Sequence, residues 1–409
     1  MDRKQSEQNR QARRTTTRRR ILRQGFVGAT GLVAGYSFFS RSAPTVNAAL
    51  ATLPAQLQPP DEHGLRLPPG FRARVVARSG ENPAASSDYQ WHRSPDGGAV
   101  FATDDGGWIY VSNSERRNAK CGVGALRFDN NANITSAYSI LSDTTFNCAG
   151  GPTPWNTWLS CEEIPTGIVW ECDPWGKRPA RPHPAMGAFR HEAAAVDPNT
   201  LVIYMTEDID QKNDGRFYRF IPDTAEKDIP NLDSGRLEVA EVTKGSEGPV
   251  RWHEIPDPSA ERLGSVRKQI PESTRFKRAE GMWIMDTIVY FATTADNRIW
   301  AYDTKDETIS LVYDEQQYSN PLLRRVDNLG ATHSGHIIAA EDRHKEQRIV
   351  ALAAPDKLVT LVELVGHDGS EIAGPAFDPS GTRLYFSSQR GLKGTGIGIT
   401  YEVTAPFAV

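Results

Sequence analysis

Leu201-Val-Ile-Tyr-Met-Thr-Glu-Asp208 is one copy of a pattern that recurs along the chain and indicates its fold. Each copy is a run of β-branched and aromatic residues that ends in small or hydroxyl-bearing residues, often followed by an acid. The other copies are Trp108–Glu115, Asn156–Glu163, Ile288–Ala295, His336–Asp342 and Arg383–Arg390. Turn residues precede several copies and a second such run follows several, as expected for antiparallel strands.

The spacing of the copies predicts a β-propeller. Successive copies lie about 45 to 48 residues apart, a period typical of propeller blades. Between the third and fourth copies, the charged segment 223–275 adds roughly the length of one more unit. We therefore expect an all-β fold, a six-bladed β-propeller over residues 49–409 with 223–275 inserted. An open all-β fold is the alternative. A parallel α/β sheet does not fit, because the amphipathic crossover helices that it needs are missing.

The N-terminal segment 1–48 predicts export from the cytoplasm. Paired arginines before Ile21-Leu22 are followed by a modestly apolar stretch and a small-residue cleavage site ending at Ala48. This order is typical of a twin-arginine signal peptide, which implies the twin-arginine translocase as a partner and a periplasmic or secreted location. A membrane anchor is the alternative, but about 15 apolar residues are too few to span a bilayer comfortably. We expect no stable membrane insertion.

The charge of the chain argues against one class of partner. The net charge of −4 provides no large basic surface, so we expect no binding to nucleic acid. We expect a monomer.

Acidic residues at the strand ends suggest a metal site. Four copies end in acid, namely Glu115, Glu162-Glu163, Glu207-Asp208 and Glu341-Asp342. Glu192, Glu280 and Glu371 lie outside the copies. The innermost strand of each propeller blade faces the channel, so equivalent positions form a ring, and like charges gathered there repel unless a cation neutralises them. Oxygen ligands suit calcium, whereas an added thiolate or imidazole suits iron.

The four cysteines leave two possibilities open. Cys121, Cys148, Cys161 and Cys172 could form two disulfides in an oxidising compartment, with Cys148 bonded to Cys161. Alternatively, at least one of them is a thiolate ligand of a metal.

One segment resembles a known family. Asn147-Cys-Ala-Gly-Gly-Pro-Thr-Pro-Trp-Asn-Thr-Trp-Leu-Ser-Cys-Glu-Glu163 is similar to the signature of PhoX-type alkaline phosphatases. Supporting matches follow in family order, namely Arg190–Glu192, Tyr204–Asp208, Gly215–Phe220 and Arg278–Gly281. The resemblance implies a six-bladed propeller that hydrolyses phosphate monoesters at a cluster of iron (Fe³⁺) and calcium ions in its channel.

The resemblance also implies roles for individual residues. Cys148 would be an iron-bound thiolate, and Arg278 would bind phosphate oxygens with Glu280 beside it in the catalytic centre. Asn113 would lie close to the cluster. The carboxylate ligands would include Glu163, Glu207 and Glu280. The expected ring of acids adds Glu115, Glu192 and Glu371 as further candidate ligands.

The residue types fit the expected chemistry of a small-molecule phosphate ester. Its negative charge resists attack, and cations neutralise that charge and activate an oxygen nucleophile, while arginine can bind the transferring phosphoryl group. Two other functions remain open. A calcium-dependent lactonase or diesterase on the same fold needs no thiolate, and a non-enzymatic binding propeller would use its cations for stability alone.

Overall fold

The computed structural model describes residues 50, 53, 56–116, 121–209, 213–226, 229–354 and 357–409. The segment 1–48, for which we expect an export signal, lies outside the described residues. Within the described part, the chain is almost entirely strands and turns. No helix there is long and apolar enough to cross a lipid bilayer.

The sheets are formed from strands that mostly follow one another in the sequence and pair antiparallel. The first sheet contains β3 (Pro95–Ala102), β4 (Trp108–Ser114), β5 (Cys121–Phe128) and β6 (Ile134–Thr144). The second contains β7 (Asn147–Pro152), β8 (Trp158–Glu162), β9 (Val169–Cys172) and β10 (Arg181–His183). A nine-stranded sheet has the order β11 (His191–Val196), β12 (Ile203–Glu207), β13 (Arg216–Pro222), β16 (Gly235–Val242), β17 (Gly248–Glu254), β21 (Thr308–Asp314), β20 (Arg298–Asp303), β19 (Ile288–Thr293), β18 (Ala279–Met285).

The remaining sheets take in the two ends of the described chain. One has the order β1 (Leu65–Arg66), β25 (Lys357–Leu364), β24 (Gln347–Ala354), β23 (Ile337–Glu341), β22 (Val326–Ala331). Another has the order β2 (Arg72–Arg78), β28 (Ile399–Thr404), β27 (Arg383–Ser388), β26 (Ile372–Phe377). A small hairpin pairs β14 (Ala225–Glu226) with β15 (Ile229–Pro230). Short 3-10 helices are η1 (Pro184–Met186), η3 (Val266–Lys268), η4 (Glu315–Gln317) and η5 (Leu392–Gly394).

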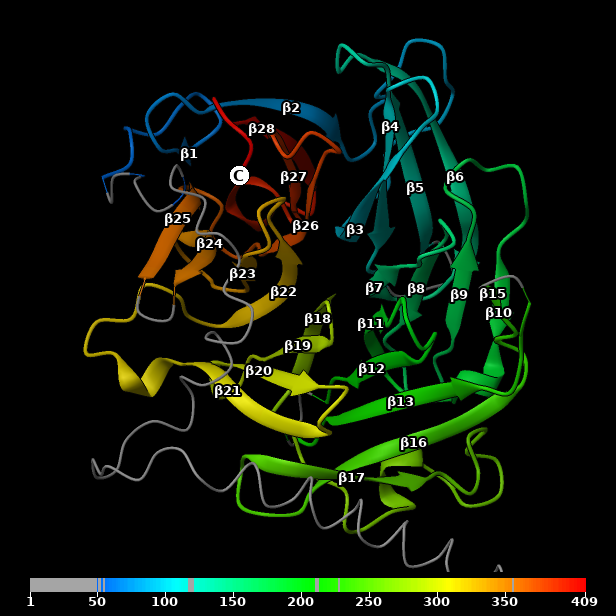
Figure 1. The fold of residues 1–409 in the computed structure, drawn as a ribbon. Helices are drawn as coiled ribbons and strands as arrows, with labels where there is room; N and C mark the ends of the chain where they lie inside the picture. Colours follow the sequence, from blue (N-terminus) through cyan, green and yellow to red (C-terminus); the bar gives the residue numbers. More distant parts are fainter. Residues whose placement is uncertain are drawn as a thin grey trace, which may run out of the picture. The chain divides into compact units, whose positions relative to one another are not determined.

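The arrangement of these sheets is that of a propeller. The six strands β3, β7, β11, β18, β22 and β26 contact one another in turn, and β26 contacts β3 again. Figure 1 shows them around a common centre, with the other strands of their sheets farther out. The expected all-β, propeller-like fold is therefore confirmed.

The sheets differ from the expected six separate blades. Four of them are separate sheets of four or five strands, whereas the third and fourth units share the nine-stranded sheet. The connection is made by β17, which lies in the segment 223–275. It pairs with β16 from Val250 to Glu254 and with β21 at Gly248 and Pro249. Strand β16 of the same segment pairs with β13 as the fourth strand of its unit.

The repeated sequence pattern occupies a different strand from the one we expected. All six copies form the second strand of their unit, namely β4, β8, β12, β19, β23 and β27. The channel is instead lined by the strand before each copy. The expectation that the copies themselves face the channel is wrong, because an additional short strand precedes each one and takes the innermost place.

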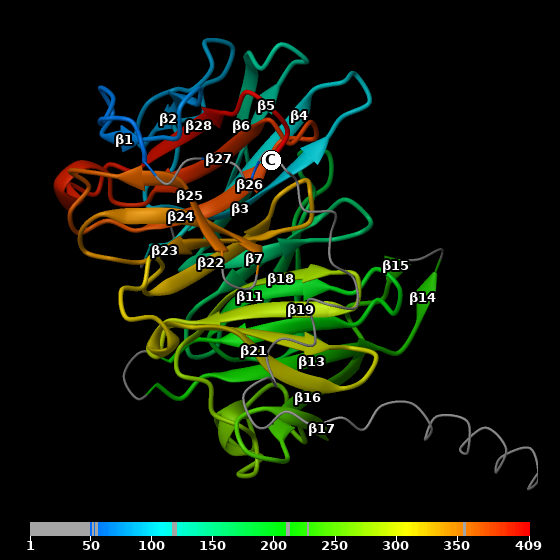
Figure 2. The ribbon, with the colours of Figure 1, turned by 60° about the vertical axis from the view of Figure 1, so that its left-hand side comes forward.

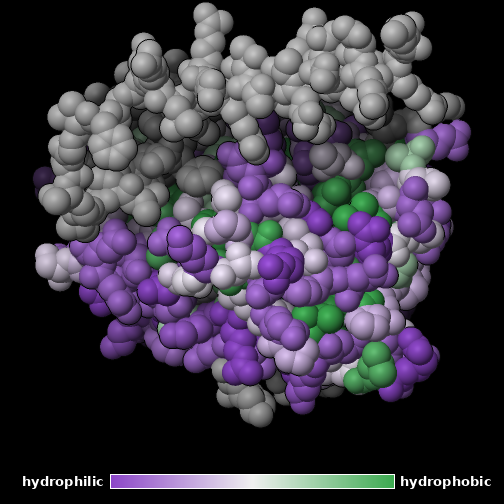
Figure 3. Space-filling view, turned by 60° about the horizontal axis from the view of Figure 1, so that its bottom comes forward, coloured by the Kyte–Doolittle hydropathy of each residue, from purple (hydrophilic) through white to green (hydrophobic). Residues whose placement is uncertain are grey.

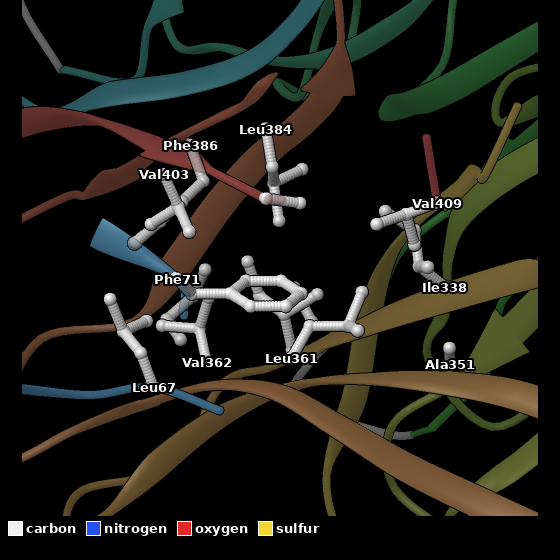
Figure 4. Packing of buried hydrophobic residues seen from close by; sticks show 14 of the residues in the cluster. Leu67, Phe71, Ile338, Ala351, Leu361, Val362, Leu384, Phe386, Val403 and Val409 are labelled. Atoms are coloured by element: carbon white, nitrogen blue, oxygen red, sulfur yellow. The ribbon is translucent and has the colours of Figure 1, made fainter. Parts of the chain in front are cut away.

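The first and last parts of the described chain close the ring. Strand β2, blue in Figure 2, pairs with β28, red, so residues far apart in the sequence complete one sheet. Phe71, just before β2, packs beside Leu361 and Val362 of β25 and near Leu384 of β27 (Figure 4). Burying such large apolar side chains stabilises the closure by about 2 kcal/mol each.

Glycines let the innermost strands approach closely at the centre. A Cβ atom on Gly281 of β18 would lie 2.6 Å from the Cα of Asn328 in β22. A Cβ on Gly151 of β7 would overlap with the carbonyl oxygen of Ala194 in β11. Beyond the first residues of the innermost strands, this close packing narrows the channel to a void of about 20 Å³. On the face shown in Figure 3, the described residues are largely hydrophilic, with small apolar patches.

We expect Gly151→Ala to lower the free energy of unfolding by about 3 kcal/mol, because the new methyl group must push backbone atoms of β11 aside. Gly245→Ala is the matched control, since its Cβ would meet nothing within 4 Å. Only its left-handed backbone, at φ +68°, opposes that change, at a cost of about 1 kcal/mol. Chemical denaturation measures both values. An equal effect of the two substitutions would contradict the close approach of β7 and β11.

Candidate metal centre

The innermost strands place an acid or a thiol at one end of the channel. Five of these residues are the second residue of their strand, and Glu371 directly precedes β26. In each of the five strands the pairing register with the second strand shifts at this point. Such an irregularity turns a side chain out of the regular alternation. The five are Asp96 of β3, Cys148 of β7, Glu192 of β11, Glu280 of β18 and Asp327 of β22.

The ends of the second strands add a further set of acids. Glu115, Glu163, Asp208 and Asp342 directly follow β4, β8, β12 and β23. The backbone N–H of Glu115 donates to the carbonyl of Ser94, just before β3. The equivalent hydrogen bond repeats for Glu163 and Asp342. It fixes each of these acids beside the start of an innermost strand.

These side chains approach one another closely enough to share cations. In four groups, one ligand atom from each residue lies within 4.8 Å of those of the others. The groups are Glu115, Cys148 and Glu163; Asp96, Glu115 and Glu371; Glu192, Glu280 and Asp327; and Asp327, Asp342 and Glu371. Because Glu115, Asp327 and Glu371 each belong to two groups, the four form one continuous cluster, which we call the acid ring.

Four arginines contact carboxylates at this end of the channel. Arg278 Nη2 lies 2.8 Å from Glu280 Oε1 and 3.0 Å from Asp208 Oδ2. The other pairs are Arg190 with Glu163 at 3.3 Å, Arg325 with Asp342 at 2.8 Å and Arg390 with Glu371 at 3.2 Å. Arg278 lies in the turn that directly precedes β18, with a left-handed backbone at φ +57°.

Burial and mutual repulsion raise the pKa values of the ring. Burial is the larger cause, and neighbouring carboxylates add to it, so the pKa of Glu115 rises to about 7, as does that of Asp327. The pKa values of Asp96, Glu163, Glu192, Glu280 and Glu371 lie well above their usual range for the same reasons. Asp342 is the exception, because hydrogen bonding and charge from Arg325 outweigh burial and lower its pKa.

The thiol of Cys148 is subject to the same forces. Burial and then the nearby carboxylates, first among them Asp96 and Glu192, raise its pKa well above the usual value. A thiolate at this position therefore requires a cation. The disulfide alternatives do not hold, since all four cysteines of the chain are free.

The residues of the ring fit bound cations. Both carboxylate oxygens of Glu192 are buried without a hydrogen-bond donor in the described part of the chain. An isolated buried carboxylate is costly unless it is protonated or binds a cation. Carboxylate oxygens are the ligands that calcium prefers, and a thiolate among them suits iron. Glu115, Cys148 and Glu163 form the group with mixed ligands.

Asn113 holds the backbone at Cys148 in place. Its side-chain amide donates to the carbonyls of Cys148 at 3.0 Å and Ala149 at 2.8 Å. Its carbonyl oxygen accepts from Trp158 Nε1 at 2.8 Å and from Ser160 Oγ at 3.0 Å. Asn113 therefore lies next to the ring, as the sequence suggested, but contacts the backbone of Cys148.

A cavity of about 640 Å³ opens over one side of the ring. Its walls include Glu115, Glu163 and Asp208, together with Arg190 and Arg278. A molecule in this cavity would thus meet carboxylates and guanidinium groups together, while the narrowed channel below prevents passage through the protein.

The structure brings together most, but not all, of the residues expected from the sequence. Arg278 and six expected ligands lie here, namely Glu115, Cys148, Glu163, Glu192, Glu280 and Glu371. Glu207 does not, because its fully buried carboxylate accepts from Tyr218 Oη at 2.8 Å and from Arg267 Nη1 at 2.7 Å. Successive side chains of a strand point to opposite faces, so Asp208 faces the ring instead.

Sequence reasoning missed two members of the ring. Asp96 and Asp327 are each the second residue of the strand just before a copy of the repeated pattern. The same position holds Cys148, Glu192 and Glu280, which the sequence did suggest. An acid or thiol shortly before each copy was therefore the available signal.

Known proteins share this sequence and architecture. The model of the family described as alkaline phosphatase PhoX matches residues 122–169 and 165–391. The chain belongs to the PhoX alkaline phosphatase family. Pseudomonas fluorescens PhoX, in a structure with the transition-state analogue vanadate, is 15% identical with a TM-score of 0.70. The similarity covers 86% of this chain and 98% of that one.

More distant solved structures resemble this PhoX-family chain less well. XC5397, a gluconolactonase from Xanthomonas campestris, is 12% identical with a TM-score of 0.47, covering 87% of this chain and 97% of that one. Virginiamycin B lyase from Staphylococcus aureus is 13% identical with a TM-score of 0.44, covering 82% and 99%. No curated protein matches the chain in sequence.

We expect Asp208→Asn to weaken metal binding about tenfold or more, because Asp208 contacts Arg278 and places a negative charge beside the ring. Glu207→Gln is the matched control on the neighbouring residue. It should leave the metal content unchanged and lower the melting temperature, since it disturbs the bond to Arg267. Elemental analysis after dialysis against a chelator measures the first effect. Loss of metal in Glu207→Gln alone would contradict this placement.

Proposed function

We propose that this protein is an exported metal-dependent phosphatase that hydrolyses phosphate monoesters at a cluster of iron and calcium ions. The observation that supports it best is the acid ring, in which eight carboxyl groups and one thiol meet within reach of shared cations. Membership of the PhoX alkaline phosphatase family supports the phosphatase activity. The cavity beside Arg278 offers a place for the phosphate ester.

Six blades are the most consistent interpretation of the sheets. Six innermost strands surround the channel, and each is followed by one copy of the repeated pattern. The nine-stranded sheet would then be two blades, β11–β12–β13–β16 and β18–β19–β20–β21, joined by β17. The short pairing of β17 with β21, at two residues, supports this division.

The chain's own residues would hold the cations and bind the substrate. Glu115, Cys148 and Glu163 would hold iron, and the all-carboxylate groups would hold calcium. Bound cations supply charge neutralisation and activation of the attacking oxygen. Arg278 would direct its guanidinium at the phosphoryl oxygens, in the low-dielectric setting where such contacts are strongest. Glu280, at 2.8 Å, would orient that guanidinium.

Export by the twin-arginine route agrees with such a centre. The acid ring needs cations to balance its repulsion, so a chain loaded with metal as it folds gains stability. A translocase that carries folded proteins would preserve that loading. Residues 1–48 have the order of such a signal, which supports a periplasmic or secreted location.

We expect the purified exported form to contain iron and several calcium ions and to hydrolyse p-nitrophenyl phosphate. Cys148→Ala should lose iron and at least about 100-fold in activity, because its thiolate would be an iron ligand. Cys172→Ala is the matched control, since that free cysteine is buried in the core, outside the ring. Elemental analysis and hydrolysis rates measure both variants. If the protein contained calcium without iron and hydrolysed no phosphate ester at any pH, the phosphatase proposal would be wrong.

A further inference from the structure

The loop between β17 and β18 forms one wall of the cavity over the acid ring. Ala260, Ser265 and Arg267 line the cavity from this loop. Ring residues Glu115 and Glu163 line it too, so a molecule bound at the ring extends toward the loop. The loop therefore faces the part of a substrate that lies away from the reacting phosphorus.

The loop is held in one conformation by its own contacts. Asp257 Oδ2 accepts the backbone N–H groups of Arg262 at 2.7 Å and Leu263 at 2.8 Å. Gln269 Nε2 donates to the carbonyl of Asp257 at 2.8 Å. Val266, next to Arg267, is completely buried. The backbone that carries Arg267 is thus held in place, and this lowers the entropy lost when its side chain binds a ligand.

Arg267 belongs to a charge network outside the acid ring. Its Nη1 lies 2.7 Å from Glu207 Oε1 and its Nε lies 3.8 Å from Asp214 Oδ2. Asp214 also pairs with Arg216 at 2.7 Å and with Arg275 at 3.3 Å. This network of three arginines and two carboxylates has one positive charge in excess.

Arg267 also has donors to spare. Its Nε is buried without a hydrogen-bond acceptor among the described residues. Arg190 and Arg278, which line the same cavity, differ from it because each contacts a carboxylate at the ring. Arg267 pairs with Glu207 and Asp214 and with no carboxylate of the ring, so the excess positive charge of its network can attract an anionic ligand.

We propose that Arg267 determines substrate specificity by binding a second anionic group, a carboxylate or a further phosphate, on the leaving group of the ester. The inference rests on the proposed phosphatase function for its reaction and on the cavity geometry for its binding. Guanidinium pairs well with both anions, because its donors match their oxygen spacing. Esters of neutral alcohols would lack this contact.

Binding of phosphonates tests the proposal without requiring hydrolysis. Phosphonoacetate and methylenediphosphonate carry a second anionic group, a carboxylate and a phosphonate respectively, and methylphosphonate carries none. In calorimetry, the full metal-loaded protein should bind phosphonoacetate or methylenediphosphonate, or both, about tenfold or more tightly than methylphosphonate. In Arg267→Gln that ratio of affinities should fall to about twofold. A preserved ratio, or no preference in the unaltered protein, would overturn the proposal.

Arg275→Gln is the matched control. It removes the same side chain from the same partner, Asp214, but Arg275 is exposed and does not line the cavity. The ratio of affinities should not change in this variant. If Arg267→Gln alone does not fold, the double variant Glu207→Gln/Arg267→Gln removes the buried pair together and gives the same measurement.

Kinetics separate this proposal from the proposed function. With 3-phosphoglycerate and phenyl phosphate as substrates, Arg267→Gln should raise KM for the first about tenfold more than for the second. Hydrolysis of both with equal effects of the substitution would contradict the role of Arg267 and leave the phosphatase intact. Absence of hydrolysis in the unaltered protein, with the phosphonate preference present, would contradict the phosphatase and leave the anion site intact.

Discussion

Repulsion among the carboxyl groups at one end of the channel is the constraint that the rest of the structure must offset. Burial removes water that would screen these charges, and each carboxylate raises the pKa of its neighbours. Arginines at the edge, such as Arg278, balance only part of the charge. Either several groups stay protonated or cations enter, and the orphaned oxygens of Glu192 favour cations. Metal affinity and fold stability are thereby coupled.

The backbone brings the charges together by repeating one local structure. A register shift at the start of the innermost strand turns one side chain toward the channel, and a hydrogen bond from the end of the second strand fixes another beside it. Two units depart from the acid pattern at the second position, where Thr294 and Gln389 replace a carboxylate. Gln389 donates to both Asp96 and Glu115, so it lowers the repulsion on that side. The ring is therefore uneven, which allows different cations at different places.

Much of this could be predicted from the sequence, because period and composition report strand repeats directly. The propeller-like fold followed from the spacing of strands such as β12, and Cys148 with Glu163 followed from one distinctive segment. Other features could not be found this way. The sequence of a strand does not show which strand of its unit lines the channel, so Asp96 and Asp327 were missed. Glu207 and Asp208 are adjacent and alike in charge, and only the direction of the side chain decides which one reaches the ring.

Closure of the channel makes the surroundings of the ring decisive for chemistry. Close packing at Gly151 and Gly281 leaves a void too small for a substrate, so a phosphate ester must enter and leave on the cavity side. The ring itself is built from acids and one thiol that successive units contribute at repeated positions. Within the described part of the chain, the loop carrying Arg267 occurs in a single unit, between β17 and β18. In the proposed reaction, selection among leaving groups therefore depends on this loop, which has no counterpart in the repeated pattern. The acids of the repeated units supply the charge that the reaction needs.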